Sequence, residues 1–337
     1  DPLHCILSGS CDGTARLWDV RESNAFASCA CFKVPDQTAV NCVQFGGRGE
    51  AGDNRIFLGC DNQILCFDLR KPGLQDRVIF GESDILCTFP PHKDEINELS
   101  VTQSGAYIAA ADDAGFSTVY SLQRFDQLFD SDQRISMKPV TTISHSQQEN
   151  IICSSTKFVS ERQLITGGMD CCIAKWNTSK KQKYYHIDFG DEQQQQMVNP
   201  KFVYNFDTLG NRAAVATGNG SVFIINHMTG EINFILESVH SSAVSQVRLC
   251  NGNDKSYLVT TGNDCNITLW DIPKEQTKQK VQPAPTKKQK GKGKKGKRNH
   301  NARPSPKAAE PQVQQEPEQQ EKPHKITTIH HSSKVNW

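Results

Sequence analysis

The sequence lacks the apolar segments of a membrane protein. No stretch approaches the roughly 18 consecutive apolar residues that a transmembrane helix needs, and hydrophobic residues make up only 36% of the 337 positions. The start of the chain has no positively charged region followed by an apolar run, as a secretory signal peptide would have. We therefore expect no association with membranes.

The sequence also lacks the common motifs of catalysis and metal binding. It contains no phosphate-binding P-loop, no G-x-S-x-G motif and no H-E-x-x-H motif. The close cysteine pairs, Cys29/Cys31 and Cys171/Cys172, do not have the spacing of zinc ligands. The chain is therefore expected to be no enzyme and to bind no cofactor or metal. Its 13 scattered cysteines are typical of free thiols in a reducing compartment, which predicts location in the nucleus, the cytoplasm or both.

An internal repeat is the main positive feature of the chain. Four segments place an Asp in a turn of small residues and an aromatic residue six positions later. These pairs are Asp12/Trp18, Asp61/Phe67, Asp170/Trp176 and Asp264/Trp270. Two weaker copies have Asp113/Tyr120, with one extra residue in the turn, and Asn219/Ile225. Six repeats are thus recognisable.

Each copy follows a segment of alternating apolar and polar residues, which is the pattern of a half-buried strand. Several of these segments are preceded by a His, as at His92, His145 and His240. The repeating unit therefore reads strand, strand, tight turn, strand, and the sequence predicts an all-β fold.

The spacing predicts a buried polar network within each unit. An Asp in the turn bonds local backbone N–H groups, while a Trp on the next strand buries its ring and directs its N–H at a partner. Two complete sets also contain a His and a Thr; they are His145, Thr166, Asp170, Trp176 and His240, Thr260, Asp264, Trp270. Asp12 and Trp18 are the corresponding residues of the first repeat. Because the group recurs in each repeat, we interpret it as structural and not as a hydrolase site.

These residues and their spacing resemble the WD-repeat family over residues 1–272 and 326–337. The resemblance implies a seven-bladed β-propeller that acts as a monomeric protein-binding scaffold. Residues 1–272 would form blades 1–6, and residues 326–337 the outer strand of blade 6 and the start of blade 7. The propeller is therefore expected to be incomplete in this chain.

A basic segment interrupts the last repeat at residues 273–325. It holds 15 Lys and Arg against 5 Asp and Glu, so the rest of the chain is acidic. The run KKQKGKGKKGKR, followed by residues rich in Pro, Gln and Glu, predicts a disordered insertion. It is either a solvated linker, a nuclear localisation signal or a nucleic-acid contact. Since no aromatic residues lie between the basic ones, any such contact would be non-specific and sensitive to salt.

Two repeats carry an Arg three positions after the aromatic residue. The segments are Trp18-Asp19-Val20-Arg21 and Phe67-Asp68-Leu69-Arg70. In the resembled family, this pattern marks propellers that dock on damaged-DNA-binding protein 1, the adaptor of cullin-4 RING ubiquitin ligases, and act as substrate receptors. The resemblance thus implies that Asp19, Arg21, Asp68 and Arg70 bind this partner. The alternative is a generic scaffold of a nuclear or cytoplasmic complex, in which these residues only stabilise local turns.

Overall fold

The computed structural model describes residues 4–22, 27–47, 54–70, 78–123, 135–190, 200–252, 255–273 and 323–330. Within these ranges the chain forms strands and two short 3-10 helices, Pro35–Gln37 (η2) and Glu82–Asp84 (η3), and no α-helix. None of the described helices is long and apolar enough to span a bilayer. The basic run and most of the segment 273–325 lie outside the described residues.

The strands form six sheets, which we number 1 to 6 in chain order. Sheet 1 contains β1 (Cys5–Gly9), β2 (Thr14–Asp19), β3 (Ala30–Lys33) and β7 (Val78–Phe80). Sheet 2 contains β4 (Val40–Phe45), β5 (Arg55–Cys60), β6 (Gln63–Asp68), β8 (Cys87–Thr88) and β12 (Ile135–Ser136). Sheet 3 contains β9 (Ile96–Val101), β10 (Tyr107–Asp112), β11 (Phe116–Ser121) and β13 (Pro139–Ser144).

The other three sheets are regular four-stranded meanders. Sheet 4 contains β14 (Cys153–Ser160), β15 (Gln163–Gly168), β16 (Cys172–Asn177) and β17 (Gln182–Asp188). Sheet 5 contains β18 (Val203–Leu209), β19 (Arg212–Thr217), β20 (Val222–Asn226) and β21 (Glu231–Leu236). Sheet 6 contains β22 (Val244–Asn251), β23 (Ser256–Gly262), β24 (Asn266–Ile272) and β25 (His324–His330).

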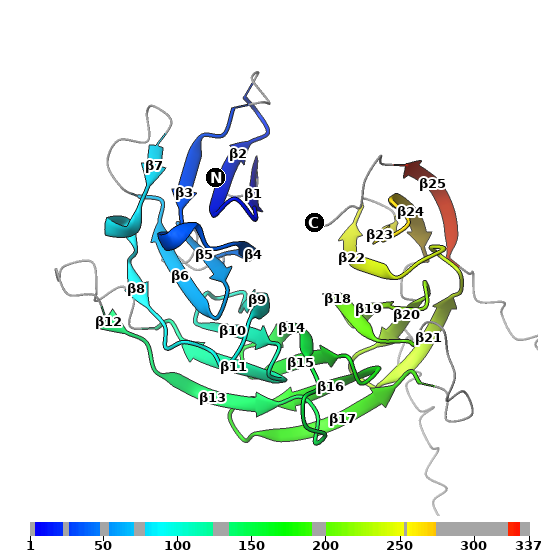
Figure 1. Ribbon diagram of the computed structural model, residues 1–337. Coiled ribbons are helices and arrows are strands. Elements are labelled where there is room, and N and C mark those ends of the chain that lie inside the picture. The colour runs from blue at the N-terminus through cyan, green and yellow to red at the C-terminus, as the bar shows by residue number, and fades with distance from the viewer. Residues whose placement is uncertain are drawn as a thin grey trace, which may run out of the picture.

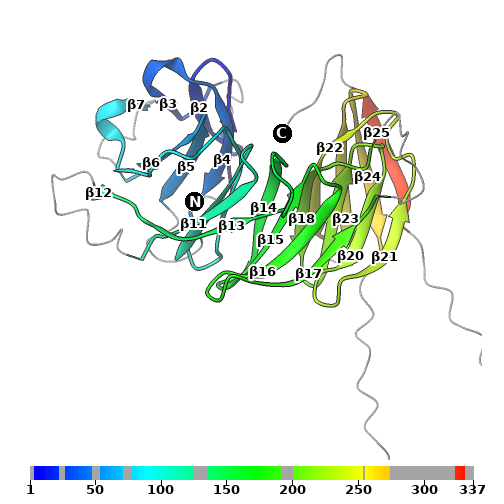
Figure 2. The ribbon, with the colours of Figure 1, turned by 60° about the horizontal axis from the view of Figure 1, so that its bottom comes forward.

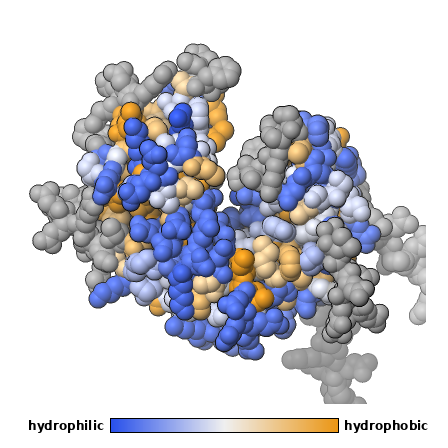
Figure 3. All heavy atoms as spheres, viewed as in Figure 1, coloured by the Kyte–Doolittle hydropathy of each residue, from blue (hydrophilic) through white to orange (hydrophobic). Residues whose placement is uncertain are grey.

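The six sheets are arranged around a common centre as an open arc (Figure 1). Strands β4, β9, β14, β18 and β22 lie innermost, and consecutive sheets lie with their faces toward one another (Figure 2). Sheets 1 and 6 face each other across the open side, and the space between them is visible at the surface (Figure 3). The prediction of an all-β fold built from the blades of a propeller is therefore confirmed.

The apolar core lies between the sheets and not within one central cluster. Each pair of neighbouring sheets buries its own group of side chains, such as Phe32 and Phe67 between sheets 1 and 2, or Phe206 and Phe223 between sheets 4 and 5. A strand that neighbouring sheets bury on both faces does not need to alternate apolar and polar residues. For this reason β5 and β19 are buried at every position.

Two short outer strands were not predicted from the sequence. After β6, the chain returns to sheet 1 and adds β7 parallel to β3 before it forms β8 in its own sheet. After β11, it adds β12 parallel to β8 of sheet 2 before it forms β13. These returns tie sheets 1, 2 and 3 together at their outer edges.

The last repeat closes with a strand from beyond the basic segment. Strand β25 pairs with β24 as the outermost strand of sheet 6, with Thr328 opposite Thr268. It starts at His324, two residues before the predicted boundary at 326. The predicted start of a seventh blade, residues 331–337, lies outside the described residues.

Candidate functional site

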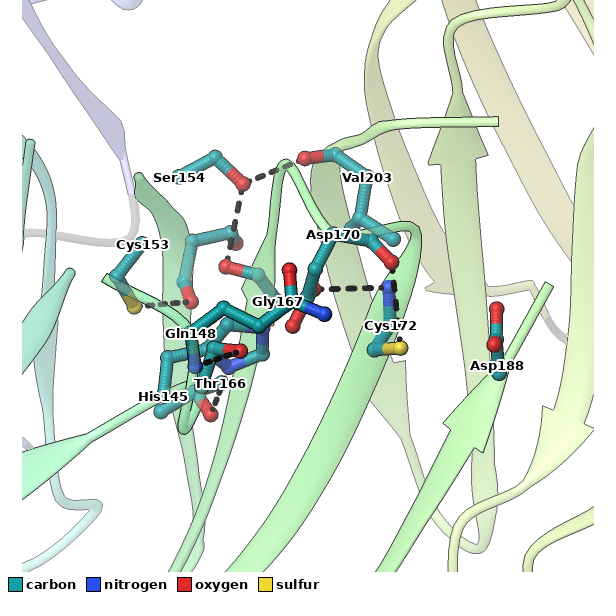
Figure 4. A network of polar contacts seen from close by, with 12 residues as sticks. His145, Gln148, Cys153, Ser154, Thr166, Gly167, Asp170, Cys172, Asp188 and Val203 are labelled. Carbon is teal, nitrogen blue, oxygen red and sulfur yellow. Dashed lines mark hydrogen bonds and ion pairs between the residues drawn. The ribbon is translucent and has the colours of Figure 1, made fainter. Parts of the chain in front are cut away.

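Sheet 4 contains the complete network that the repeat predicts, of which Figure 4 shows His145, Thr166 and Asp170. The hydroxyl of Thr166 on β15 lies 2.8 Å from His145 Nδ1 and accepts the indole N–H of Trp176 at 2.9 Å. His145 Nε2 lies 3.0 Å from Asp170 Oδ1, and the same carboxylate accepts the backbone N–H of Cys172. The network thus links two strands, the turn between them and the segment that precedes the sheet.

Sheet 6 repeats this arrangement. Asp264 Oδ1 lies 2.9 Å from His240, whose other ring nitrogen lies 2.9 Å from the Thr260 hydroxyl. Trp270 donates to the same hydroxyl at a longer 3.4 Å. The network of sheet 6 is therefore looser at its indole end than that of sheet 4.

The carboxylates of both networks are held in their ionised form. Burial by itself raises the pKa of Asp170, but hydrogen bonds from His145 and the Cys172 backbone outweigh it, so that the net pKa is lowered. Burial likewise raises and hydrogen bonds from Ser241 and His240 lower the pKa of Asp264, again with a net decrease. Each ionised carboxylate therefore stabilises the folded state at neutral pH.

In sheet 1 the two predicted network residues are not joined. Asp12 accepts the backbone N–H and the hydroxyl of Thr14, at 2.9 and 2.7 Å, and so stabilises only its own turn. Trp18 donates to the Ser8 hydroxyl at 3.0 Å. No described His connects the two bonds, which leaves sheet 1 with two local contacts in place of one network.

In sheet 3 the prediction chose the wrong Asp. Asp112, and not Asp113, lies 3.0 Å from His92 Nδ1, and His92 Nε2 lies 3.2 Å from the hydroxyl of Tyr120. Asp113 instead accepts the amide of Asn97 at 2.7 Å. The pairing of β10 with β9 shifts by one residue just before Asp112, and such a bulge re-aims the next side chain.

A different polar arrangement lies at the end of β2 in sheet 1. The Asp19 carboxylate accepts two bonds from the Arg21 guanidinium, from Nε at 2.9 Å and from Nη2 at 2.6 Å, and also accepts the Arg21 backbone N–H. These hydrogen bonds lower the pKa of Asp19 and raise that of Arg21. The Arg21 side chain remains 55% exposed, and no described residue accepts a bond from its Nη1.

Sheet 2 repeats this arrangement at the equivalent place. Asp68 accepts the Arg70 backbone N–H at 2.8 Å and its guanidinium at 3.1 Å from Nε and 2.8 Å from Nη2. The Arg70 side chain is 44% exposed, against 10% for Asp68. Because β2 and β6 are equivalent strands of adjacent sheets (Figure 1), the two Arg side chains lie at corresponding ends of these sheets.

The other sheets have a polar residue at the position of Asp19 but no Arg at the position of Arg21. Asn177, Asn226 and Ser121 occupy the position of Asp19, and each accepts a backbone N–H from two or three residues further on. A polar residue that caps this turn is therefore a general feature. The Arg is not, because the corresponding positions hold Gln123, Ser179, Met228 and Pro273.

Comparison with known proteins agrees with this architecture. The model of the WD domain, G-beta repeat, matches residues 2–19 and 233–271. The chain is also similar to the WD repeat-containing protein 53 homolog of Dictyostelium discoideum, with 28% identity over 294 residues, which cover 80% of this chain and 73% of the relative. The chain is thus similar to WD-repeat proteins in both sequence and architecture. WD-repeat domains generally act as protein-interaction scaffolds, so protein binding is the activity that this similarity supports.

The similarity to the protein 53 homolog is not confined to one part of the chain. The identity extends over most of both chains and is therefore not limited to one repeat.

One further polar network was missed because its residues are far apart in the sequence. The buried carboxylate of Glu98, on β9, accepts the backbone N–H of Thr156 at 2.9 Å and pairs with Lys157 Nζ at 2.9 Å. It also accepts from Asn205 on β18, whose amide oxygen accepts from Arg248 on β22. Innermost strands of four WD repeats are thus joined near the centre. The only sequence signal is a Glu within the apolar strand INELSV.

The described residues contain neither a disulfide bond nor a cluster of metal-binding side chains. All 13 cysteines lie within the described residues and are not disulfide-bonded. Burial raises the pKa of Cys60 and Cys172 to about 12, so these thiols stay protonated at neutral pH. Among the described residues, no three His, Cys, Asp or Glu side chains are grouped closely enough to hold a metal ion.

Proposed function

We propose that this WD-repeat protein is a substrate receptor that docks on damaged-DNA-binding protein 1, the adaptor of cullin-4 RING ubiquitin ligases. The observation that carries the proposal is the pair of exposed, Asp-held arginines, Arg21 and Arg70, at equivalent ends of adjacent sheets. This is the arrangement that the W-D-x-R pattern of such receptors leads one to expect. Phe67 replaces the Trp of the pattern in sheet 2.

The geometry suits an interface. A guanidinium that its own Asp already holds by two bonds loses little side-chain entropy when a partner binds. The remaining donors of Arg21 are fixed in direction, which favours recognition of carbonyl or carboxylate oxygens. Val20, between Asp19 and Arg21, is 60% exposed and adds an apolar contact beside the first guanidinium. Arginines in such positions often dominate binding energy.

Replacement of both arginines tests the proposal. A hot-spot Arg contributes about 2 kcal/mol or more, so Arg21→Ala with Arg70→Ala should weaken adaptor binding by roughly 1000-fold or more if the two effects add. Affinity for the purified adaptor, measured with the full chain, provides the readout. A matched control carries Arg16→Ala and Arg162→Ala, which remove two exposed arginines elsewhere and should leave the affinity unchanged.

Two results would decide against the proposal. If the double variant binds the adaptor as well as the wild type does, the arginines do not dock. If its melting temperature falls sharply, the two Asp–Arg pairs stabilise the turns, and the chain is a generic scaffold. We also propose a nuclear or cytoplasmic location, supported by the 13 free thiols; fluorescence microscopy of the tagged protein tests it.

A further inference from the structure

Lys175 stands out among the equivalent positions of the six sheets. It lies on β16, directly before Trp176, and its side chain points toward sheet 5. Every other sheet has an apolar residue or a Cys at this position; these are Leu17, Cys66, Val119, Ile224 and Leu269. A charged side chain at one such position therefore has no counterpart in the repeat.

The ammonium group of Lys175 is buried without an anion. The residue is only 4% exposed, and its Nζ donates to the backbone oxygen of His227 at 3.0 Å and contacts the Met228 sulfur at 3.7 Å. No carboxylate among the described residues pairs with it. Burial accordingly lowers the pKa of Lys175.

Such an arrangement is costly for the isolated protein. A buried cation needs a partner charge to offset its loss of hydration, and a thioether is a weak acceptor. The His227 oxygen is also shared, because the Tyr185 hydroxyl donates to it at 2.6 Å. A Leu, which sheets 1 and 6 have at this position, or a Met would fill the space at a lower cost in folding free energy.

Exposed apolar and basic residues belong to the strands and turns beside Lys175 in sheets 4 and 5. Met228, which covers the ammonium, is 56% exposed, and Ile232 and Ile235 of β21 are 44% and 49% exposed. Lys180 and Lys181 are exposed in the turn that leads from β16 to β17. The one acid at the start of β21, Glu231, is exposed and accepts from the Thr229 hydroxyl. Strands β17 and β21 lie side by side at the outer edge of the arc (Figures 1 and 2).

We propose that this outer edge between sheets 4 and 5 binds an acidic segment of a partner protein. A Glu or Asp carboxylate of the segment takes the place of the Met228 sulfur at Lys175, and a neighbouring apolar side chain packs on Ile232 and Ile235. The flexible Met side chain is well suited to move aside. The carboxylate supplies the missing counter-charge, and the lysines of the turn attract it.

This site is independent of the adaptor-docking arginines. Arg21 and Arg70 belong to sheets 1 and 2, on the other part of the arc. Both surfaces could thus be occupied in the same molecule, and loss of one should not affect the other.

A peptide array tests the proposal directly. It carries ten-residue peptides with a central Glu or Asp and one Leu, Ile or Phe within three residues, each beside a matched peptide with Gln or Asn. The labelled full chain should retain the acidic peptides at least tenfold more strongly than their amide counterparts, and this preference should weaken in high salt. Lys175→Met should abolish it, whereas the control Lys180→Met, with the same change in charge, should keep most of it.

Stability measurements separate a binding role from a structural one. If Lys175 is present for binding, Lys175→Met keeps or raises the melting temperature while it loses the preference for acidic peptides. A large fall in melting temperature would make Lys175 a structural link and overturn the proposal. So would an equal preference in wild type and variant, or none in either. Binding of phosphatidylserine vesicles that depends on Lys175, without peptide binding, would assign the surface to membranes instead.

Discussion

Replacement of Thr166 by Val is expected to cost more stability than its size suggests. The substitution keeps the shape of the side chain and removes one hydroxyl. That hydroxyl accepts the Trp176 indole N–H at 2.9 Å and lies 2.8 Å from His145 Nδ1. Thr166 is fully buried and the His145 side chain has no exposed surface, so water cannot replace the lost partner.

The magnitude follows from two buried polar groups that lose their bond. Each costs roughly 1–3 kcal/mol, which gives about 2–6 kcal/mol for the Trp176 and His145 atoms together. Thr260→Val in sheet 6 should cost less, because Trp270 lies 3.4 Å from that hydroxyl and is partly exposed. The network therefore predicts both the size of each loss and that Thr166→Val is the more destabilising of the two.

Urea unfolding followed by tryptophan fluorescence gives the free energies of unfolding. The control is Thr208→Val, since the Thr208 hydroxyl makes no hydrogen bond to any residue that the structure describes; its effect should stay within about 0.5 kcal/mol. A loss of less than 1 kcal/mol for Thr166→Val would refute the argument that the network fixes sheet 4. Equal losses for Thr166→Val and Thr208→Val would refute it as well.

Two further perturbations test the turn geometry and the buried acid. Because the folded pKa of Asp170 is lowered, its stabilisation is present above about pH 4 and is lost as pH falls through the folded pKa. The gap in unfolding free energy between wild type and Asp170→Asn should therefore narrow as the pH falls below about 4; a constant gap would contradict the assignment. Gly115 has φ +86°, and a Cβ there would lie 2.3 Å from the Ile151 oxygen, so Gly115→Ala should destabilise by about 2 kcal/mol or more. Gly210, at φ +59° with open space around it, is the control, and Gly210→Ala should cost only about 1 kcal/mol; equal melting temperatures for the two variants would show that the close approach does not matter.

Features confined to one hairpin could be predicted from the sequence. The distance of six residues from Asp170 to Trp176 spans one turn and one strand, so it fixes where the two side chains lie relative to each other. The same holds for Asp19 and Arg21, which are joined by a two-residue turn. Local hydrogen bonds depend on few residues, and their pattern is therefore visible in the repeat.

Features that involve two sheets could not be predicted in this way. The choice of Asp112 over Asp113 depends on a bulge in the pairing of β10 with β9. Strands β7 and β12 pair with sheets formed earlier in the chain, and their few residues carry no pattern of their own. The network of Glu98 joins residues that are 58 and 107 positions apart.

The sequence by itself determined the WD repeat, the number of recognisable units and the two Asp–Arg turns, because these follow from short-range spacing. Only the tertiary structure decided that Lys175 is buried and that its ammonium lies on the His227 oxygen without an anion among the described residues. Burial is a property of what packs against a strand, and the neighbouring sheet is formed by residues some 50 positions away. For Lys175 that neighbour turns an ordinary surface residue type into a candidate binding group.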